Sequence, residues 1–140
     1  MLAVKEKKQS SSYVVETVKL QSETLKKWQI PQHIIADIEL AIEEILTNIV
    51  THGYEQSFNE YNEEIIVDLR RTDDHVEVDI IDKGKFFDLT KKENPQMANY
   101  LADNVIGGLG VYMVKNVMCK VECQNNEGTN ITKLKKCYIQ

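Results

Sequence analysis

Two short segments near the middle of the chain show the alternation of apolar and polar residues that is typical of half-buried β-strands. The segment "EEIIVDLRR" places Ile65, Val67 and Leu69 on one face, and "HVEVDIID" repeats the pattern up to Ile80. The intervening "TDD" is a turn signal, so the pattern predicts an antiparallel hairpin. One face of this hairpin is apolar and must be covered by other elements.

Helical periodicity predicts the layer that covers it. A first helix is expected to begin near the serines of "SSS", which are good N-cap residues, and to end before Pro31. A second helix is expected from Pro31 to Gly53, and "VYMVKNVM" predicts a third. The second helix has a broad apolar arc formed by Ile34, Ile38, Ala41, Ile42, Ile45, Leu46 and Ile49.

The rest of the chain predicts two more strands and a long irregular connection. The strands are "KVECQ" and "NITKLKKCYI", and the second breaks its alternation near Lys133, which indicates a bulge or an edge position. The connection from Gly84 to Gly110 is long enough to act as a lid, and a short helix is expected within it around 97–101. We predict an α+β fold, a two-layer sandwich of a mostly antiparallel mixed sheet with helices on one face, as one domain over residues 1–140.

Composition narrows the class of protein. Of 140 residues, 42% are hydrophobic and 28% are charged, as in soluble globular domains. The net charge of -5 argues against nucleic-acid binding, and the lysines at 133, 135 and 136 are interpreted as a solvated strand. No apolar run is long enough for a signal peptide or a membrane span, so we expect a cytoplasmic protein.

The cysteines are odd in number and irregular in spacing. Cys119, Cys123 and Cys137 form neither a C-x-x-C motif nor a zinc-binding pattern. They are therefore predicted to be reduced and to have packing roles in a reducing compartment.

The second helix carries the first candidate site. Glu44, Asn48 and His52 follow one another at intervals of four residues. Glu44 and Asn48 fall at the edge of the apolar arc, with His52 turned further into it. A half-shielded carboxylate can be tuned and still reached by a ligand. The helix alone does not distinguish such a site from a boundary stripe that makes local hydrogen bonds.

The end of the second strand carries another candidate. Asp82 continues the parity of Val78 and Ile80, so it is predicted to face the buried layer. A buried carboxylate requires donors, and the exocyclic amine of adenine is a suitable one. The following Gly84 allows a backbone to pass close to such a ligand. The alternative is an ordinary turn-forming aspartate at a strand end.

Two glycine-containing turns complete the set. Gly107, Gly108, Leu109 and Gly110 immediately precede a helical run, and a helix N-terminus reached in this way is a ready phosphate site. This is not a Walker A loop, because no G-K-[ST] ending is present. The segment "NEGTNIT" places Thr129 at the turn into the last strand, where a simple hairpin turn is the alternative.

The order of these elements is more specific than any one of them. Glu-x-x-x-Asn on a helix, Asp-x-Gly after a strand, Gly-x-Gly opening a helix and Gly-Thr before a strand resemble the N, G1, G2 and G3 boxes of the GHKL, or Bergerat-fold, ATPases. The segments "EEILTNIVTHGY", "DKGKFFD", "GGLGVYMVKNVM" and "NEGTNIT" are further similar to the anti-sigma factor serine kinases of bacterial partner-switching systems. The resemblance extends over essentially the whole chain.

The resemblance implies a role for each position. Glu44 is implied as the general base, Asn48 as the ligand of Mg²⁺, and Asp82 as the reader of the adenine amine. Magnesium keeps several waters, so one amide and the ATP phosphates form a sensible ligand set. The other implied contacts to ATP are His52, Gly84, Gly107, Gly108, Leu109, Gly110 and Thr129.

The implied function is phosphorylation, by Mg-ATP, of a serine or threonine on a STAS-type anti-anti-sigma protein. The same domain is expected to sequester a sigma factor or similar client and to form a homodimer. An alternative of a different class is a nucleotide-gated binding module without useful catalysis, because the segment between Asp88 and Gly107 has no arginine. A histidine-kinase catalytic domain is disfavoured, since no dimerisation helix with a phosphoacceptor histidine fits before the N box.

Overall fold

The computed structural model describes residues 10–54, 64–91 and 109–139. Its helices are α2 (Ser10–Lys27), α3 (Gln32–Asn48) and α5 (Leu109–Val117), with a π-helical turn η1 (Ile49–Gly53) and a 3₁₀ turn η2 (Leu89–Lys91). Its strands are β1 (Ile66–Arg71), β2 (His75–Asp82), β3 (Lys120–Asn126) and β4 (Thr129–Cys137). The predicted helices and strands in these ranges are confirmed, while the predicted short helix at 97–101 lies outside the described residues.

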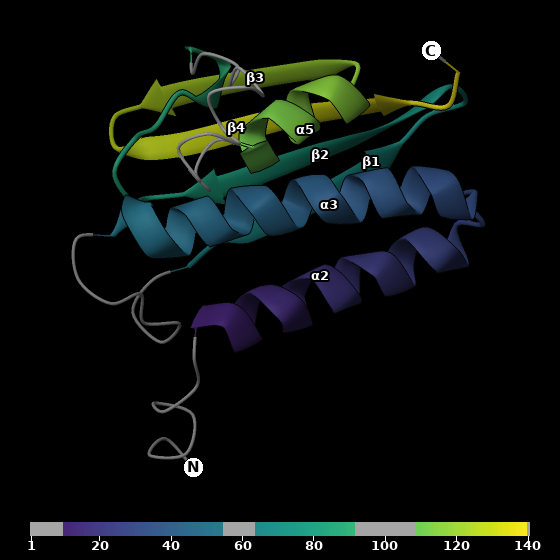
Figure 1. Cartoon of the computed structure of the whole chain (residues 1–140), viewed down its shortest axis with the longest axis horizontal. Coiled ribbons are helices and arrows are strands. Elements are labelled where there is room, and N and C mark those ends of the chain that lie inside the picture. Colours follow the sequence, from purple (N-terminus) through teal and green to yellow (C-terminus); the bar gives the residue numbers. More distant parts are fainter. Residues whose placement is uncertain (1–9, 55–63, 92–108, 140) are drawn as a thin grey trace, which may run out of the picture.

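The strands form one sheet in the order β1-β2-β4-β3, and each neighbouring pair is antiparallel. Figure 1 shows α3 and α5 lying across one face of this sheet, with α2 alongside α3. The predicted α+β sandwich with helices on one face is therefore confirmed.

The core lies between the sheet and α3, where the predicted apolar faces of the strands and of the helix face each other. The apolar arc of α3, the inward-facing residues of β2 and the buried residues of α5 belong to one hydrophobic cluster. The largest fully buried side chains are Leu25, Ile35, Ile38, Ile42, Leu46, Val76, Val78, Ile80 and Val114. Because burial alternates along β2, its last residue, Asp82, lies in the same layer as these apolar side chains.

Strand β4 is central, and its pairing register with β2 and with β3 is unbroken past Lys133. The predicted bulge or edge position there was wrong. Burial alternates regularly along the strand, but Asn130, Thr132 and Lys136 occupy core-facing positions and are polar. The hydropathy pattern was broken because the buried face is polar, not because the backbone is irregular.

Lys136 departs from the predicted solvated strand. It is only 4% exposed. Its Nζ lies 2.8 Å from the carboxylate of Asp37 and donates to the carbonyl of Val117 at 2.7 Å. This cation therefore joins α3, β4 and the carbonyl end of α5, where a positive charge is favourable.

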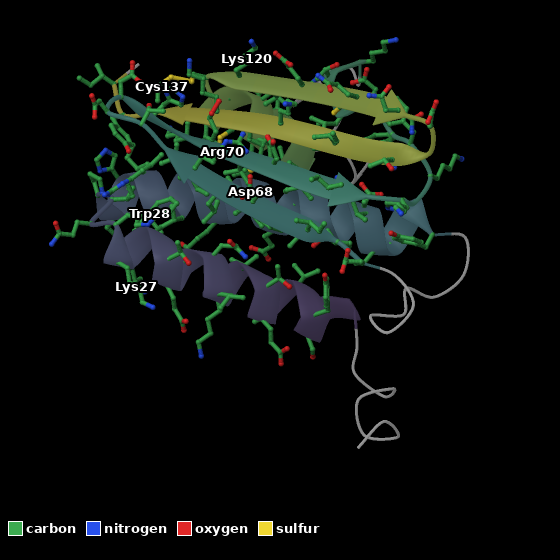
Figure 2. The ribbon with its side chains drawn as sticks, turned by 180° about the vertical axis from the view of Figure 1, so that it is seen from behind. Lys27, Trp28, Asp68, Arg70, Lys120 and Cys137 are labelled. Atoms are coloured by element: carbon green, nitrogen blue, oxygen red, sulfur yellow. A yellow bond between two sulfur atoms is a disulfide. The ribbon has the colours of Figure 1, made fainter. Side chains whose placement is uncertain are left out.

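The prediction of three reduced cysteines was wrong for two of them. Cys119 and Cys137 form a disulfide, with their Cα atoms 6.0 Å apart and 18 residues apart in sequence (Figure 2). Cys123 is a free thiol. The disulfide joins the residue just before β3 to the end of the adjacent β4, and this proximity comes from strand pairing and not from sequence spacing.

The other face of the sheet is charged. Figure 2 shows Asp68 and Arg70 on the face turned away from α3. Arg70 pairs with Asp68 at 2.6 Å and with Asp79 on the neighbouring strand at 3.2 Å.

Among the described residues, no helix is both long and apolar enough to cross a membrane.

Candidate functional site

The candidate site begins at the C-terminal end of α3. Glu44 and Asn48 are half-buried, and Asn48 is the last residue of α3. The chain then enters the π-helical turn η1. Such a turn is wider than an α-helical one, so the spacing of four no longer continues the stripe. His52 is consequently exposed, and its predicted place in the apolar arc was wrong.

Glu44 meets the start of α5 at Gly110, where any larger residue would push the carboxylate away. A Cβ built on Gly110 would lie 2.1 Å from Cδ of Glu44 and 2.2 and 2.3 Å from its two carboxylate oxygens. Gly110 is the second residue of α5, and the half-buried Leu109 is the first. The carboxylate therefore lies against a helix N-terminus, where amide N–H groups and the helix dipole favour negative charge.

Asp82 is buried at the end of β2, with 3% of its surface exposed. Its Oδ2 accepts hydrogen bonds from the backbone N–H of Gly84 at 2.9 Å and from Nδ2 of Asn130 at 3.1 Å. The predicted core-facing orientation is confirmed. The donors that a buried carboxylate requires are supplied in part by the protein itself.

Asn130 is the site residue that sequence reasoning missed. It pairs directly with Asp82 across β2 and β4 and is 5% exposed. Its Nδ2 also donates to the carbonyl of Gly84 at 2.8 Å, while its Oδ1 accepts from Nδ2 of Asn125 at 2.6 Å. The available signal was the core-facing parity of "NITKL", which puts an asparagine, a threonine and a leucine on one face.

Thr129 precedes Asn130 at the first position of β4 and is half-buried. It follows a two-residue hairpin turn in which Glu127 and Gly128 both have positive φ, 50° and 87°. Positive φ at both turn residues is the geometry that two-residue hairpins favour. The simple hairpin-turn interpretation of this segment is confirmed, and the nucleotide contact of Thr129 stays a prediction.

The loop after β2 packs directly on the end of the α3–η1 helix. A Cβ on Gly84 would lie 2.6 Å from the carbonyl oxygen of Gly53, and the N–H of Lys85 donates to that same oxygen. Gly84 is thus required by the approach of another backbone segment. This packing brings the segment that follows Asn48 against the loop that follows Asp82.

The part of the loop that leads away from Asp82 is ordered by local hydrogen bonds. The hydroxyl of Thr90 donates to Asp88 at 2.5 Å, which holds the pKa of that carboxyl below its usual range. Burial raises the pKa of the nearby Cys123 thiol above its usual value. Lys91 ends the described part of this segment; Lys92, Gly107 and Gly108 lie outside the described residues.

Together these contacts outline the architecture of a Bergerat-type ATP-binding domain. A helix carrying Glu44 and Asn48, a buried Asp82 at a strand end and a glycine at the start of α5 converge at one end of the sandwich. The family model described as "Histidine kinase-like ATPase domain" matches residues 9–136. The chain belongs to this family.

Proteins with similar sequences include several serine-protein kinases. The chain is 30% identical over 105 residues to the serine-protein kinase RsbW of Bacillus subtilis, covering 72% of this chain and 64% of the relative. It is 32% identical over 105 residues to RsbW of Listeria innocua, covering 72% and 65%. It is 32% identical over 113 residues to RsbW of one Bacillus cereus strain, covering 76% and 65%. The aligned part spans less than two thirds of each relative's length.

Proposed function

We propose that this domain binds Mg-ATP and transfers its terminal phosphoryl group to a serine or threonine of a protein substrate. The observation that carries the proposal is the contact between the Glu44 carboxylate and Gly110. It joins a candidate base to a helix N-terminus suited to phosphate. The serine-protein kinase names of the relatives support the same reaction class.

The chemistry assigned to the chain's own groups is acid–base and electrostatic. The half-buried carboxylate of Glu44 accepts the proton of the incoming hydroxyl as that oxygen attacks the γ-phosphorus, while the bond from this phosphorus to the β,γ-bridging oxygen breaks and ADP leaves. The N–H groups at the start of α5 stabilise negative charge on the phosphates. Asp82 accepts a hydrogen bond from the adenine amine. His52, Gly84, Gly107, Gly108, Leu109 and Thr129 are proposed to line the nucleotide.

The residues present fit a magnesium ion that is shared with the nucleotide. Within the described ranges, no group of three or more His, Cys, Asp or Glu side chains is arranged to hold a metal by itself. The amide oxygen of Asn48, one helical turn from Glu44, is a hard neutral ligand of the kind that magnesium takes beside phosphate oxygens and water. When bound, the ion neutralises charge on the phosphates; Asn48 supplies the proposed protein ligand.

The proposed partners follow from the resemblance to partner-switching kinases. The substrate is proposed to be a STAS-type anti-anti-sigma protein, and the second partner a sigma factor or similar client that the domain sequesters. We also propose that the working form is a homodimer. Co-purification in the presence of ADP and of ATP tests both partners, since partner exchange should follow the nucleotide, and light scattering tests the homodimer.

The sharpest test of the reaction uses two neighbouring glutamates. Glu44→Ala should abolish transfer of label from ATP to a STAS protein while binding of Mg-ATP stays largely intact. Glu43→Ala is the matched control, because Glu43 is exposed on the solvent side of the same helix turn and should leave transfer unchanged. Full transfer by the Glu44→Ala protein would contradict the assignment of the base.

A second candidate function is a nucleotide-gated binding module with no useful catalysis. It is favoured by the absence of arginine between Asp88 and Gly107, because lysine offers a point charge without the bidentate fork of arginine. Wild-type protein that binds Mg-ATP but transfers no label to any STAS protein tested would support this module over the kinase.

A further inference from the structure

The side chains behind Asp82 form a hydrogen-bonded chain across three strands. Asn125 on β3 donates to Asn130 on β4 at 2.6 Å, and Asn130 donates to Asp82 on β2 at 3.1 Å. Asn125 and Asn130 are register partners, as are Asn130 and Asp82. Two short amides and a carboxylate therefore lie in one line along the end of the sheet.

We propose that Asn130 is a positioning residue that fixes Asp82 as a hydrogen-bond acceptor. It thereby sets a preference for 6-aminopurine over 6-oxopurine nucleotides. The inference rests on the proposed nucleotide function of this site. Asn125 has the supporting role of orienting the amide of Asn130.

The orientation of the Asn130 amide is determined by its partners. Its NH₂ group faces two groups that can accept, the Asp82 carboxylate and the Gly84 carbonyl at 2.8 Å. Reversing the amide would turn an oxygen toward both of these oxygens and an NH₂ group toward the NH₂ of Asn125. Hydrogen-bond capacity thus permits one arrangement of the network.

The consequence for the ligand follows from the atoms of Asp82. Within the described part of the chain, its hydrogen bonds from Gly84 and Asn130 both fall on Oδ2. Oδ1 is therefore the oxygen left for a ligand, and it presents an acceptor. A 6-amino group donates to it, whereas a 6-oxo group would put two acceptors together and leave both without a partner.

A matched pair of substitutions tests the hydrogen bond that Asn130 donates to Asp82. Asn130→Thr and Asn130→Val introduce side chains of nearly equal size, both suited to a strand, and only threonine keeps a hydroxyl that can donate to Asp82. Calorimetry with Mg-ATP and with Mg-GTP gives the ratio of the two affinities. We expect Asn130→Val to lower the ATP:GTP ratio by about tenfold or more, and Asn130→Thr to keep it within about threefold of wild type.

Asn125→Ala provides an independent variant, because Asn125 is exposed and its truncation does not threaten the fold. Loss of its hydrogen bond should lower the ATP:GTP ratio by about threefold. An Asn130→Val protein that is folded and has the wild-type ratio would overturn the inference. If that variant does not fold, an unchanged ratio in Asn125→Ala overturns it instead.

These outcomes separate the inference from the proposed function. Wild-type protein that binds ATP, combined with unchanged ratios in the variants, overturns the role of Asn130 alone. Wild-type protein that binds no ATP overturns the proposed function and this inference with it. A general loss of stability would weaken ATP and GTP equally, so the ratio reports positioning and not folding.

Discussion

Gly110→Ala is the substitution for which the structure gives the most direct expectation. The added Cβ would lie 2.1 Å from Cδ of Glu44 and 2.2 and 2.3 Å from its carboxylate oxygens. Carbon atoms pack at roughly 3.5–4.0 Å, so the carboxylate must retreat by more than about 1 Å. The far end of a glutamate is flexible, so the side chain can move while the helices stay in place.

The expected result is a loss of rate without a loss of fold. A misplacement of about 1 Å in a reacting group can cost roughly 100-fold in rate, so phosphoryl transfer should fall by about that factor. Alanine is a better helix former than glycine by up to about 1 kcal/mol, which offsets the cost of moving Glu44. The free energy of unfolding should therefore change by less than about 1 kcal/mol. Affinity for Mg-ATP should stay within about threefold of wild type.

The assay combines single-turnover transfer of labelled phosphate with calorimetry and thermal unfolding. A double-mutant cycle with Glu44→Ala tests the cause: any residual rate of the Glu44→Ala protein should not fall further when Gly110→Ala is added, because the carboxylate is already absent. A Gly110→Ala protein with wild-type transfer would refute the reasoning. So would an equal loss of rate in the presence and absence of the Glu44 carboxylate.

Three further predictions concern the framework around the site. Cys119→Ser or Cys137→Ser should each lower the free energy of unfolding by about 3 kcal/mol in non-reducing buffer, for a loop closed over 18 residues, and have no effect in reductant. Lys136→Met should lower the free energy of unfolding by about 2 kcal/mol, because the Val117 carbonyl and the Asp37 carboxylate lose the donor that they share. An unchanged midpoint in chemical denaturation would contradict this. Thr90→Val should raise the pKa of Asp88, measured by NMR titration of its carboxyl carbon, because the hydroxyl that stabilises the carboxylate is gone. The stability difference between this variant and wild type should be present above the usual pKa of aspartate and vanish as pH falls through the lowered pKa of the folded wild type; a constant difference would argue against it.

Periodicity predicted the parts of the fold that obey a single pattern. The β1–β2 hairpin and the apolar arc of α3 were predicted because each repeats its apolar residues at the period of its backbone. Strand β4 was misread because its buried face carries Asn130 and Lys136, whose partners lie on other elements. Sequence alone does not reveal that a polar residue is satisfied by a distant partner.

The candidate site was also predicted correctly in some parts and wrongly in others. Asp82 was predicted to be buried from its parity, and its burial is confirmed. His52 was predicted to continue the stripe of Glu44 and Asn48, but the π-helical turn changes the rotation per residue and leaves it exposed. The disulfide was missed because a separation of 18 residues carries no signal until strand pairing brings the two cysteines together.

The sequence by itself determined the element order and the sheet-and-helix layering, because both follow from local periodicity. The candidate roles of Glu44, Asn48 and Asp82 are implied by the resemblance of its motifs to the GHKL ATPases. The tertiary structure alone decided which groups touch. Gly110 faces the Glu44 carboxylate, and Asn130 holds Asp82, because helix packing and strand register bring together residues that lie far apart in sequence. The chemistry proposed for this domain depends on those contacts, and residue spacing along one chain does not specify them.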